Sequence, residues 1–319
     1  DLLPLRQTYV NLGHDLPSRL IAAIDRMYPA LRFFRHQGGE LALFNGATTT
    51  LAHELMSVLR YDETAGKPFK ALPHVNYQRL AVGDTVVLVD TGLPVSAEMS
   101  RTAHAGCLSF EMSSGRYRYI INSGSPRFAG EHYKQLARAT AAHSTVTVND
   151  TSSSRISKSS MSGPILIDGV TETTVERLDG VEGGEGLTAT HDGYLEPFGL
   201  IHVRTIHLNS TGTLIRGKDR LMTEDGADPD AASEDTAVLR FHIHPQIDIK
   251  RIDKREARLT APDGEVWTLS TLDADIVLED DVFFADPSGL RASRQIELTV
   301  KIAEQPEVYW VMTRSKPPG

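Results

Sequence analysis

The spacing of apolar residues changes its character at about residue 70. From Asp15 to Phe34, apolar side chains recur at alternating steps of four and three residues, which is the period of one face of a helix. Thr50 to Leu59 repeats this spacing. Pro29 interrupts the first pattern, so we expect a helix that ends near Tyr28, followed by a turn or a short second helix. The pattern therefore predicts a helical segment over residues 1–70.

Beyond this point, short runs rich in Val, Ile, Thr, Tyr and Phe alternate with clusters of Gly, Asp, Asn and Ser. Many short strands at such spacing are typical of antiparallel sheets packed as a sandwich. No helical pattern alternates with the strands, which disfavours a doubly wound parallel sheet. We therefore expect a mainly β protein, with a large antiparallel β-sandwich over residues 71–319 after a few α-helices. The expected strands are Thr85–Val89, Cys107–Met112, Tyr117–Ile121, Thr145–Val148, His202–Leu208, Val238–Ile243 and Val308–Thr313.

Composition and charge exclude several classes of protein. The 319 residues include 33 Lys+Arg and 42 Asp+Glu, and the formal net charge of −9 argues against a broad nucleic-acid or anionic-membrane surface. No apolar run approaches the length of a membrane span. One cysteine, Cys107, excludes an internal disulfide framework and reads as an inert buried thiol. The first residue is Asp1 rather than Met, which suggests a fragment or processed chain with room for an export signal upstream.

Two glycine-rich or acidic segments read as loops. Gly180–Gly186 carries four glycines, and Glu224–Asp235 carries six carboxylates. The acidic segment is best interpreted as a solvated insertion. A calcium loop is the alternative, but the spaced ligand order of an EF-hand is absent.

The densest candidate chemistry lies in a predicted hairpin. A three-residue loop ending in Gly115 would pair Met112 with Arg116 and make His104 and Asn122 diagonal neighbours on one face. A shift of one residue would put them on opposite faces. His143 opens a later strand, and two histidines with one oxygen ligand would suit zinc. From spacing alone, a core-edge His104 held by a hydrogen bond is the favoured interpretation, and an amide is a poorer zinc ligand than a carboxylate.

Three segments carry a family resemblance. His104-x-Gly-x-Leu-x-Phe110, then Asn122-Ser-Gly124, then Arg138-x-Thr140-x-x-His143-Ser-Thr145 resembles the C-terminal sheet domain of the heparinase II/III-like family. The match is good from about Tyr77 to Thr145 and extends elsewhere by architecture. The resemblance implies a polysaccharide lyase with a helical toroid followed by a β-sandwich, so that residues 1–70 would be the end of the toroid.

The resemblance also implies site residues. His104 and His143 fall on metal-type positions, and Asn122 stands where the family has an Asp. The lyase pattern His-x-His-x-Asp-x-Gly-x-Phe departs here, with Thr102 at the first His, Gly106 at the Asp and Leu108 at the Gly. These departures bear directly on zinc binding and on standard catalysis.

A lyase acting on a uronic-acid polymer needs a base, groups that neutralise the developing charge and a proton donor. The catalytic candidates are Tyr133 and His104. The candidate substrate-binding residues are Arg35, His36, Arg138, His191 and Tyr194. Packing, ion pairing or turn formation is the structural alternative for each. His242 and His244 resemble a cupin-like metal pair, but no Glu follows at short spacing, so a polar sheet face is favoured.

We therefore expect the C-terminal part of a heparinase II/III-like protein that performs β-elimination on an acidic polysaccharide such as a glycosaminoglycan or alginate. The alternative is a non-catalytic polysaccharide-binding or scaffolding module of the same fold. The resemblance implies a bacterial periplasmic or cell-envelope location, with zinc as the candidate cofactor. Neither a nucleic-acid partner nor a membrane span is expected.

Overall fold

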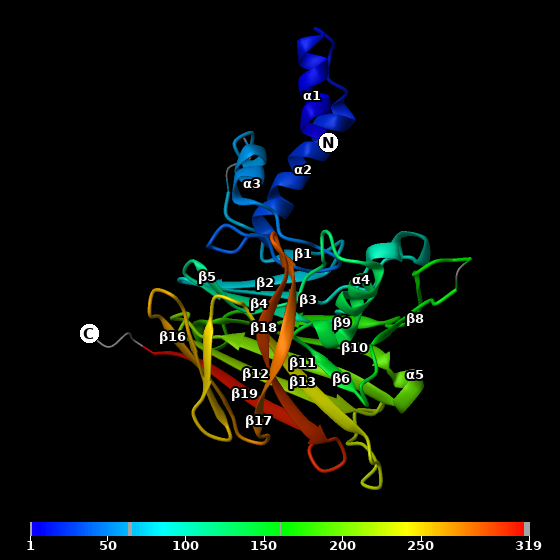
Figure 1. Cartoon of the computed structure of the whole chain (residues 1–319), viewed down its shortest axis with the longest axis vertical. Coiled ribbons are helices and arrows are strands. Elements are labelled where there is room, and N and C mark those ends of the chain that lie inside the picture. Colours follow the sequence, from blue (N-terminus) through cyan, green and yellow to red (C-terminus); the bar gives the residue numbers. More distant parts are fainter. Residues whose placement is uncertain (1, 63–65, 160, 316–319) are drawn as a thin grey trace.

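Three N-terminal helices stand at one end of a stack of β-sheets (Figure 1). The computed structural model describes residues 2–62, 66–159 and 161–315. The helices are α1 (Leu2–Asn11), α2 (Ser18–Phe34) and α3 (Ala52–Leu59), and the predicted mainly β fold class is confirmed. No helix in the described part of the chain combines the length and the apolar character needed to cross a bilayer.

The sheets in the described residues are antiparallel throughout. The first has the order β1-β2-β3-β4-β5-β13-β18-β17, with β6 also paired to β13, and the second has the order β14-β15-β16-β19-β12-β11-β10-β9. A small third sheet pairs β7 with β8. The strands of the first sheet are β1 (Ala71–Leu72), β2 (Tyr77–Val82), β3 (Thr85–Asp90), β4 (Phe110–Ser114), β5 (Tyr117–Ile121), β6 (Val146–Val148), β13 (Thr236–Ile243), β17 (Ile276–Asp286) and β18 (Gly289–Lys301).

The remaining elements complete the sandwich. The strands of the second and third sheets are β7 (Ser154–Ile156), β8 (Leu166–Gly169), β9 (Thr173–Arg177), β10 (Glu185–Tyr194), β11 (Leu200–Leu208), β12 (Leu214–Met222), β14 (Asp248–Arg251), β15 (Glu256–Thr260), β16 (Val266–Thr271) and β19 (Glu307–Ser315). Short helices are η1 (Ala97–Thr102), α4 (Glu131–Arg138), η2 (Thr140–Ala142), η3 (Val181–Gly183) and α5 (Leu195–Phe198). Each of the seven runs expected to be strands overlaps one; the largest difference is at Cys107–Met112, where β4 begins only at Phe110.

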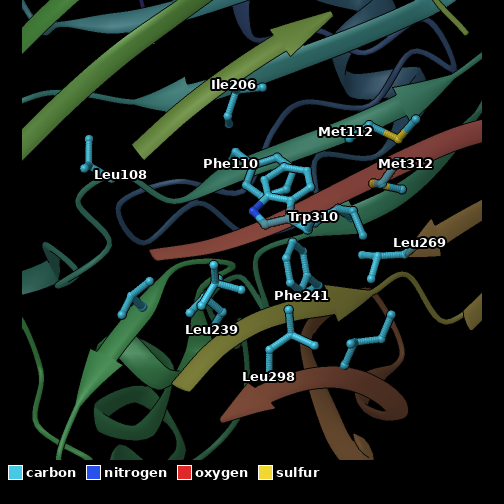
Figure 2. Close-up of a cluster of buried hydrophobic side chains, with 14 of the residues drawn as sticks. Leu108, Phe110, Met112, Ile206, Leu239, Phe241, Leu269, Leu298, Trp310 and Met312 are labelled. Atoms are coloured by element: carbon cyan, nitrogen blue, oxygen red, sulfur yellow. The ribbon is translucent and has the colours of Figure 1, made fainter. Parts of the chain in front are cut away.

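Aromatic side chains fill the space between the two large sheets (Figure 2). Phe110 of β4 stacks on Trp310 of β19, with ring centroids 5.4 Å apart and planes 10° from parallel. Phe241 of β13 meets the same indole edge to face at 5.2 Å. Gly217 pairs with Trp310 across the second sheet, and a Cβ there would lie 2.0 Å from the indole ring. The indole therefore occupies the space that any larger residue at position 217 would need.

Two expectations about local structure were wrong. Helix α2 continues through Pro29 to Phe34 instead of ending near Tyr28. Phe33 belongs to a buried cluster with Tyr77 and Leu88 of the first sheet, so this packing offsets the backbone hydrogen bond that proline cannot make.

The hairpin register also differs from the expected one. Ser114 pairs with Tyr117 and Met112 with Ile120, with a bulge between, because Gly115 has a left-handed φ of 51° and closes a two-residue turn. β4 begins only at Phe110, so His104 lies in a loop and is not placed by strand pairing.

Replacing Gly217 with Ala tests the packing against Trp310. The added methyl must displace the indole, and we expect the free energy of unfolding to fall by about 3 kcal/mol. Urea denaturation measures this change. Gly66→Ala is the matched control, because a Cβ at Gly66 meets nothing within 4 Å; equal stability of the two variants would contradict the packing argument.

Candidate functional site

The structure brings His104 and His143 into direct contact. His104 Nδ1 lies 3.0 Å from His143 Nε2, and the rings meet edge to face. His104 is 5% exposed and His143 is 1% exposed, so the pair is closed off from solvent. His143 Nδ1 lies 2.8 Å from the carbonyl oxygen of Ala139.

These contacts fix the tautomers of both rings. The Ala139 carbonyl can only accept, so His143 carries its proton on Nδ1 and its Nε2 accepts from the Nδ1–H of His104. Burial lowers the pKa of His143 to about 4, and burial together with the neighbouring His143 lowers the pKa of His104 well below its ordinary value. Both imidazoles are therefore neutral at pH 7 and are bonded to each other.

Asn122 completes the predicted trio but does not present an oxygen to it. Its Oδ1 accepts from the backbone N–H of Ser144 at 3.0 Å, which fixes the amide orientation. Its Nδ2 is buried and has no hydrogen-bond partner among the residues that the structure describes. An orphaned N–H donor cannot coordinate a cation.

The positions of His104, His143 and Asn122 do not offer zinc a complete set of ligands. Zinc would have to replace the proton between the two imidazoles and find at least one further ligand. Among the described residues, no three His, Cys, Asp or Glu side chains lie together in a metal-binding arrangement. The residues as placed do not fit a tetrahedral zinc site, and zinc binding stays a prediction.

The absence of a side chain at Gly106 allows His143 to pack closely against the loop that carries His104. A Cβ at Gly106 would lie 2.7 Å from His143 Cδ2, so the imidazole fills the place where a side chain at position 106 would begin. The aspartate of the lyase pattern therefore cannot stand at position 106 while His143 keeps this position. The loop before α3 covers the other side, because a Cβ at Gly46 would lie 3.6 Å from His104 Nε2.

A second buried cluster beside this loop was missed by the sequence analysis. Asn45 accepts from the backbone N–H of His104 at 3.2 Å and donates to the Tyr77 hydroxyl at 2.6 Å. Tyr77 donates to Asp90 at 3.3 Å, and burial raises the pKa of Asp90 to about 7. The Asn-Gly pair at positions 45–46, both with positive φ, was the available signal for a special turn here.

The other predicted site residues lie apart from the imidazole pair. Tyr133 is 40% exposed on α4, and no hydrogen bond or ring contact joins it to His104 or His143 among the described residues. Arg138 is buried, and its guanidinium donates to the carbonyls of Ala103, Pro164 and Ser100. Its geometry therefore favours holding loops together over binding a substrate carboxylate, contrary to the substrate-binding expectation.

The remaining predicted substrate-binding residues are mostly interior. His36 is buried between Ser113 Oγ at 2.8 Å and Glu111 Oε2 at 3.0 Å, and burial lowers its pKa. His191 and Tyr194 are also buried, with the Tyr194 hydroxyl donating to the Val146 carbonyl at 2.7 Å. These three side chains cannot contact a sugar in this conformation.

Arg35 is half-buried at the end of α2 and donates to the carbonyl of Gly39 at 3.3 Å. It is therefore partly available at the base of the helices.

His242 and His244 do not form a metal pair. His242 Nδ1 donates to Asp281 at 2.7 Å and His244 Nε2 lies 3.3 Å from Arg118 Nη2, so each has its own partner. Burial lowers the pKa of His244 to about 2. This agrees with the favoured interpretation of a polar sheet face.

Comparison with known proteins identifies the family. Residues 64–311 match the family model described as heparinase II/III-like, C-terminal. The chain belongs to the heparinase II/III-like family. FtsZ-localized protein C of Caulobacter vibrioides (strain NA1000 / CB15N) is 31% identical over 328 residues, covering 99% of this chain and 56% of that protein.

Solved structures show the heparinase II/III-like fold. A heparinase III, the BT4657 gene product, superposes with a TM-score of 0.70 at 14% identity over 95% of this chain and 48% of that one. The heparan sulfate lyase HepC from Pedobacter heparinus gives a TM-score of 0.66 at 15% identity over 98% and 50%. The chain thus spans about half the length of these relatives.

The pH dependence of stability tests the buried neutral pair. Because the pKa of His143 is about 4 when folded and 6.5 for the ordinary group, its contribution is complete above about pH 6.5 and is lost as the pH falls toward 4. Between pH 7 and 4.5 we expect His143→Gln to lose about 2–3 kcal/mol less unfolding free energy than the native chain. Urea denaturation at both pH values measures this, with the exposed His14→Gln as control. A pH dependence in His143→Gln equal to that of the native chain would show that His143 is not held neutral.

Proposed function

We propose that this chain is a non-catalytic polysaccharide-binding module built on the heparinase II/III-like fold. The observation that carries the proposal is the imidazole pair at the family's metal positions, closed on itself at 3.0 Å and buried. Proton abstraction requires a base that reaches the substrate. His104 and His143 are hydrogen-bonded to each other below the surface, which leaves neither ring free for this task.

The neighbouring groups support the same proposal. Charge neutralisation during elimination would need a free cation or donor, yet the guanidinium of Arg138 is bonded to three backbone carbonyls. Thr102 and Gly106 replace the His and Asp of the lyase pattern. The chain thus has the fold of the family but lacks two side chains of the lyase pattern. A shared fold does not by itself imply a shared function.

The lyase proposal itself rests on different residues. Tyr133 is exposed and lines a hollow of about 290 Å³ with Arg127, Phe128 and Asp286, so a proton donor, a cation and a carboxylate share one surface hollow. β-Elimination on an acidic polysaccharide would use Tyr133 there, with further groups from the rest of the full-length protein. A periplasmic or cell-envelope location accompanies either polysaccharide proposal.

The full-length protein and a panel of acidic polysaccharides separate the two proposals. With heparan sulfate, hyaluronan and alginate we expect retention on the immobilised polymer without growth of the ultraviolet absorbance of an unsaturated uronate. Binding is measured by affinity electrophoresis and turnover by absorbance. Turnover that disappears in Tyr133→Phe but persists in Tyr309→Phe, an exposed tyrosine on β19, would establish the lyase instead.

A second candidate function comes from the Caulobacter relative, whose name refers to localisation with FtsZ. Identity of 31% over 99% of this chain supports a shared localisation with FtsZ, which we propose as the second candidate. The two candidates differ in place, because a scaffold of this kind would follow FtsZ and a polysaccharide-binding module would follow its polymer.

Co-sedimentation with FtsZ polymers tests this second candidate. If it holds, the full-length protein pellets with FtsZ in the presence of GTP and stays in the supernatant when GDP prevents polymerisation. Equal amounts in the two pellets would rule out an interaction with the polymer.

A further inference from the structure

A groove with a mostly apolar lining lies between α4 and β7. α4 and β8, the partner of β7, lie on the same side of the molecule (Figure 1). Its volume is about 450 Å³. The side chains that matter for binding are Gln135 of α4 with Ser152, Ser154, Arg155, Ser157 and Lys158. This α4–β7 groove contains none of the residues that the family resemblance singled out.

The charge of the α4–β7 groove is opposite to that of the chain as a whole. The chain carries a net charge of −9, but the groove is lined by two cations and by no carboxylate. Lys158 is exposed and forms no ion pair among the described residues. Arg155 donates to Asp168 through Nη2 at 2.7 Å, and its other N–H groups make no hydrogen bond among the described residues. A local positive site on an acidic protein favours an anionic ligand.

Two of the three groove serines make a single hydrogen bond among the described residues, accepted from a backbone N–H, whereas Ser157 Oγ is bonded to Ser162 Oγ at 2.9 Å. Ser152 Oγ accepts from the backbone N–H of Thr140 at 3.1 Å, and Ser154 Oγ accepts from that of Val170 at 3.4 Å. Each oxygen is thus fixed by a backbone group while its own proton makes no hydrogen bond among the described residues. Hydroxyl donors beside two cations match a ligand rich in acceptor oxygens, as the carboxylate or sulfate and ring hydroxyls of an acidic sugar are.

We propose that the α4–β7 groove binds an acidic sugar unit and is the polysaccharide contact of this chain. This rests on the proposed polysaccharide-binding function and moves the contact away from the buried imidazole pair. Lys158 and Arg155 supply positive charge for the anionic group, and the Ser152 hydroxyl supplies a donor for a sugar oxygen.

A charge-matched pair of double variants tests the proposal in the full-length protein. Lys158→Glu with Arg155→Gln should weaken binding to heparan sulfate and alginate about tenfold, and the native affinity should fall as salt rises. Lys250→Glu with Arg251→Gln makes the same charge change on exposed β14 and should stay within about twofold of native. Affinity electrophoresis in gels containing each polymer, with neutral dextran as reference, gives the affinities.

The possible results distinguish failure of the proposed groove from failure of the proposed polysaccharide-binding function. Native binding that survives in the groove variant, or that falls equally in both variants, overturns the groove and leaves polysaccharide binding intact. A native protein that binds no acidic polymer overturns both. If thermal unfolding shows that the groove variant does not fold, Lys158→Ala alone replaces it, with an expected loss of about threefold.

Discussion

A buried ion pair between Arg204 and Asp219 joins neighbouring strands of the second sheet and positions a guanidinium that also reaches the segments beside the first sheet. Arg204 Nε donates to Asp219 Oδ1 at 2.7 Å, and Trp310 Nε1 donates to the other carboxylate oxygen at 2.9 Å. Burial alone would raise the pKa of Asp219, but the Arg204 charge and the His202 hydrogen bond hold that pKa below its ordinary value. Arg204 Nη1 also donates to the carbonyls of Leu108 at 2.7 Å and Ser144 at 2.8 Å, which lie in segments next to β4 and β6 of the first sheet. Losing either partner would leave an uncompensated charge in the core.

The same guanidinium sets the geometry of the candidate site. Leu108 has a φ of 58°, a conformation that costs energy for a residue with a Cβ, and the bond from Arg204 holds its carbonyl in that state. Ser144 directly follows His143, and Leu108 lies in the same loop as His104. The two carbonyls that accept hydrogen bonds from Arg204 therefore belong to the segments that carry the two imidazoles. The Arg204 guanidinium therefore links the two segments that carry the closed pair.

The sequence predicted the strands well because alternating burial is a local signal, and it brought His104 and His143 together through a family pattern. Tertiary effects decided the rest. The bulge next to Gly115 changed the hairpin register, and the packing of Phe33 carried α2 past Pro29. Strand alternation also cannot tell which polar side chains lie inside. His191, for example, faces His202 on the neighbouring strand, and His202 in turn reaches Asp219, a chain of bonds that no spacing within one segment reveals.

Burial divides the titratable groups of this sandwich into two populations with different uses. The interior histidines are bonded to protein partners and several have lowered pKa values, so they contribute to the architecture and exchange few protons near pH 7. Of the exposed cations beside α4, Arg155 is paired with Asp168, whereas Lys158 forms no ion pair among the described residues. Net charge is a property of the whole surface, whereas recognition depends on the field within about one Debye length of the ligand. A chain with a net charge of −9 can thus carry a positive field at one point of its rim, while the buried imidazole pair holds loops together.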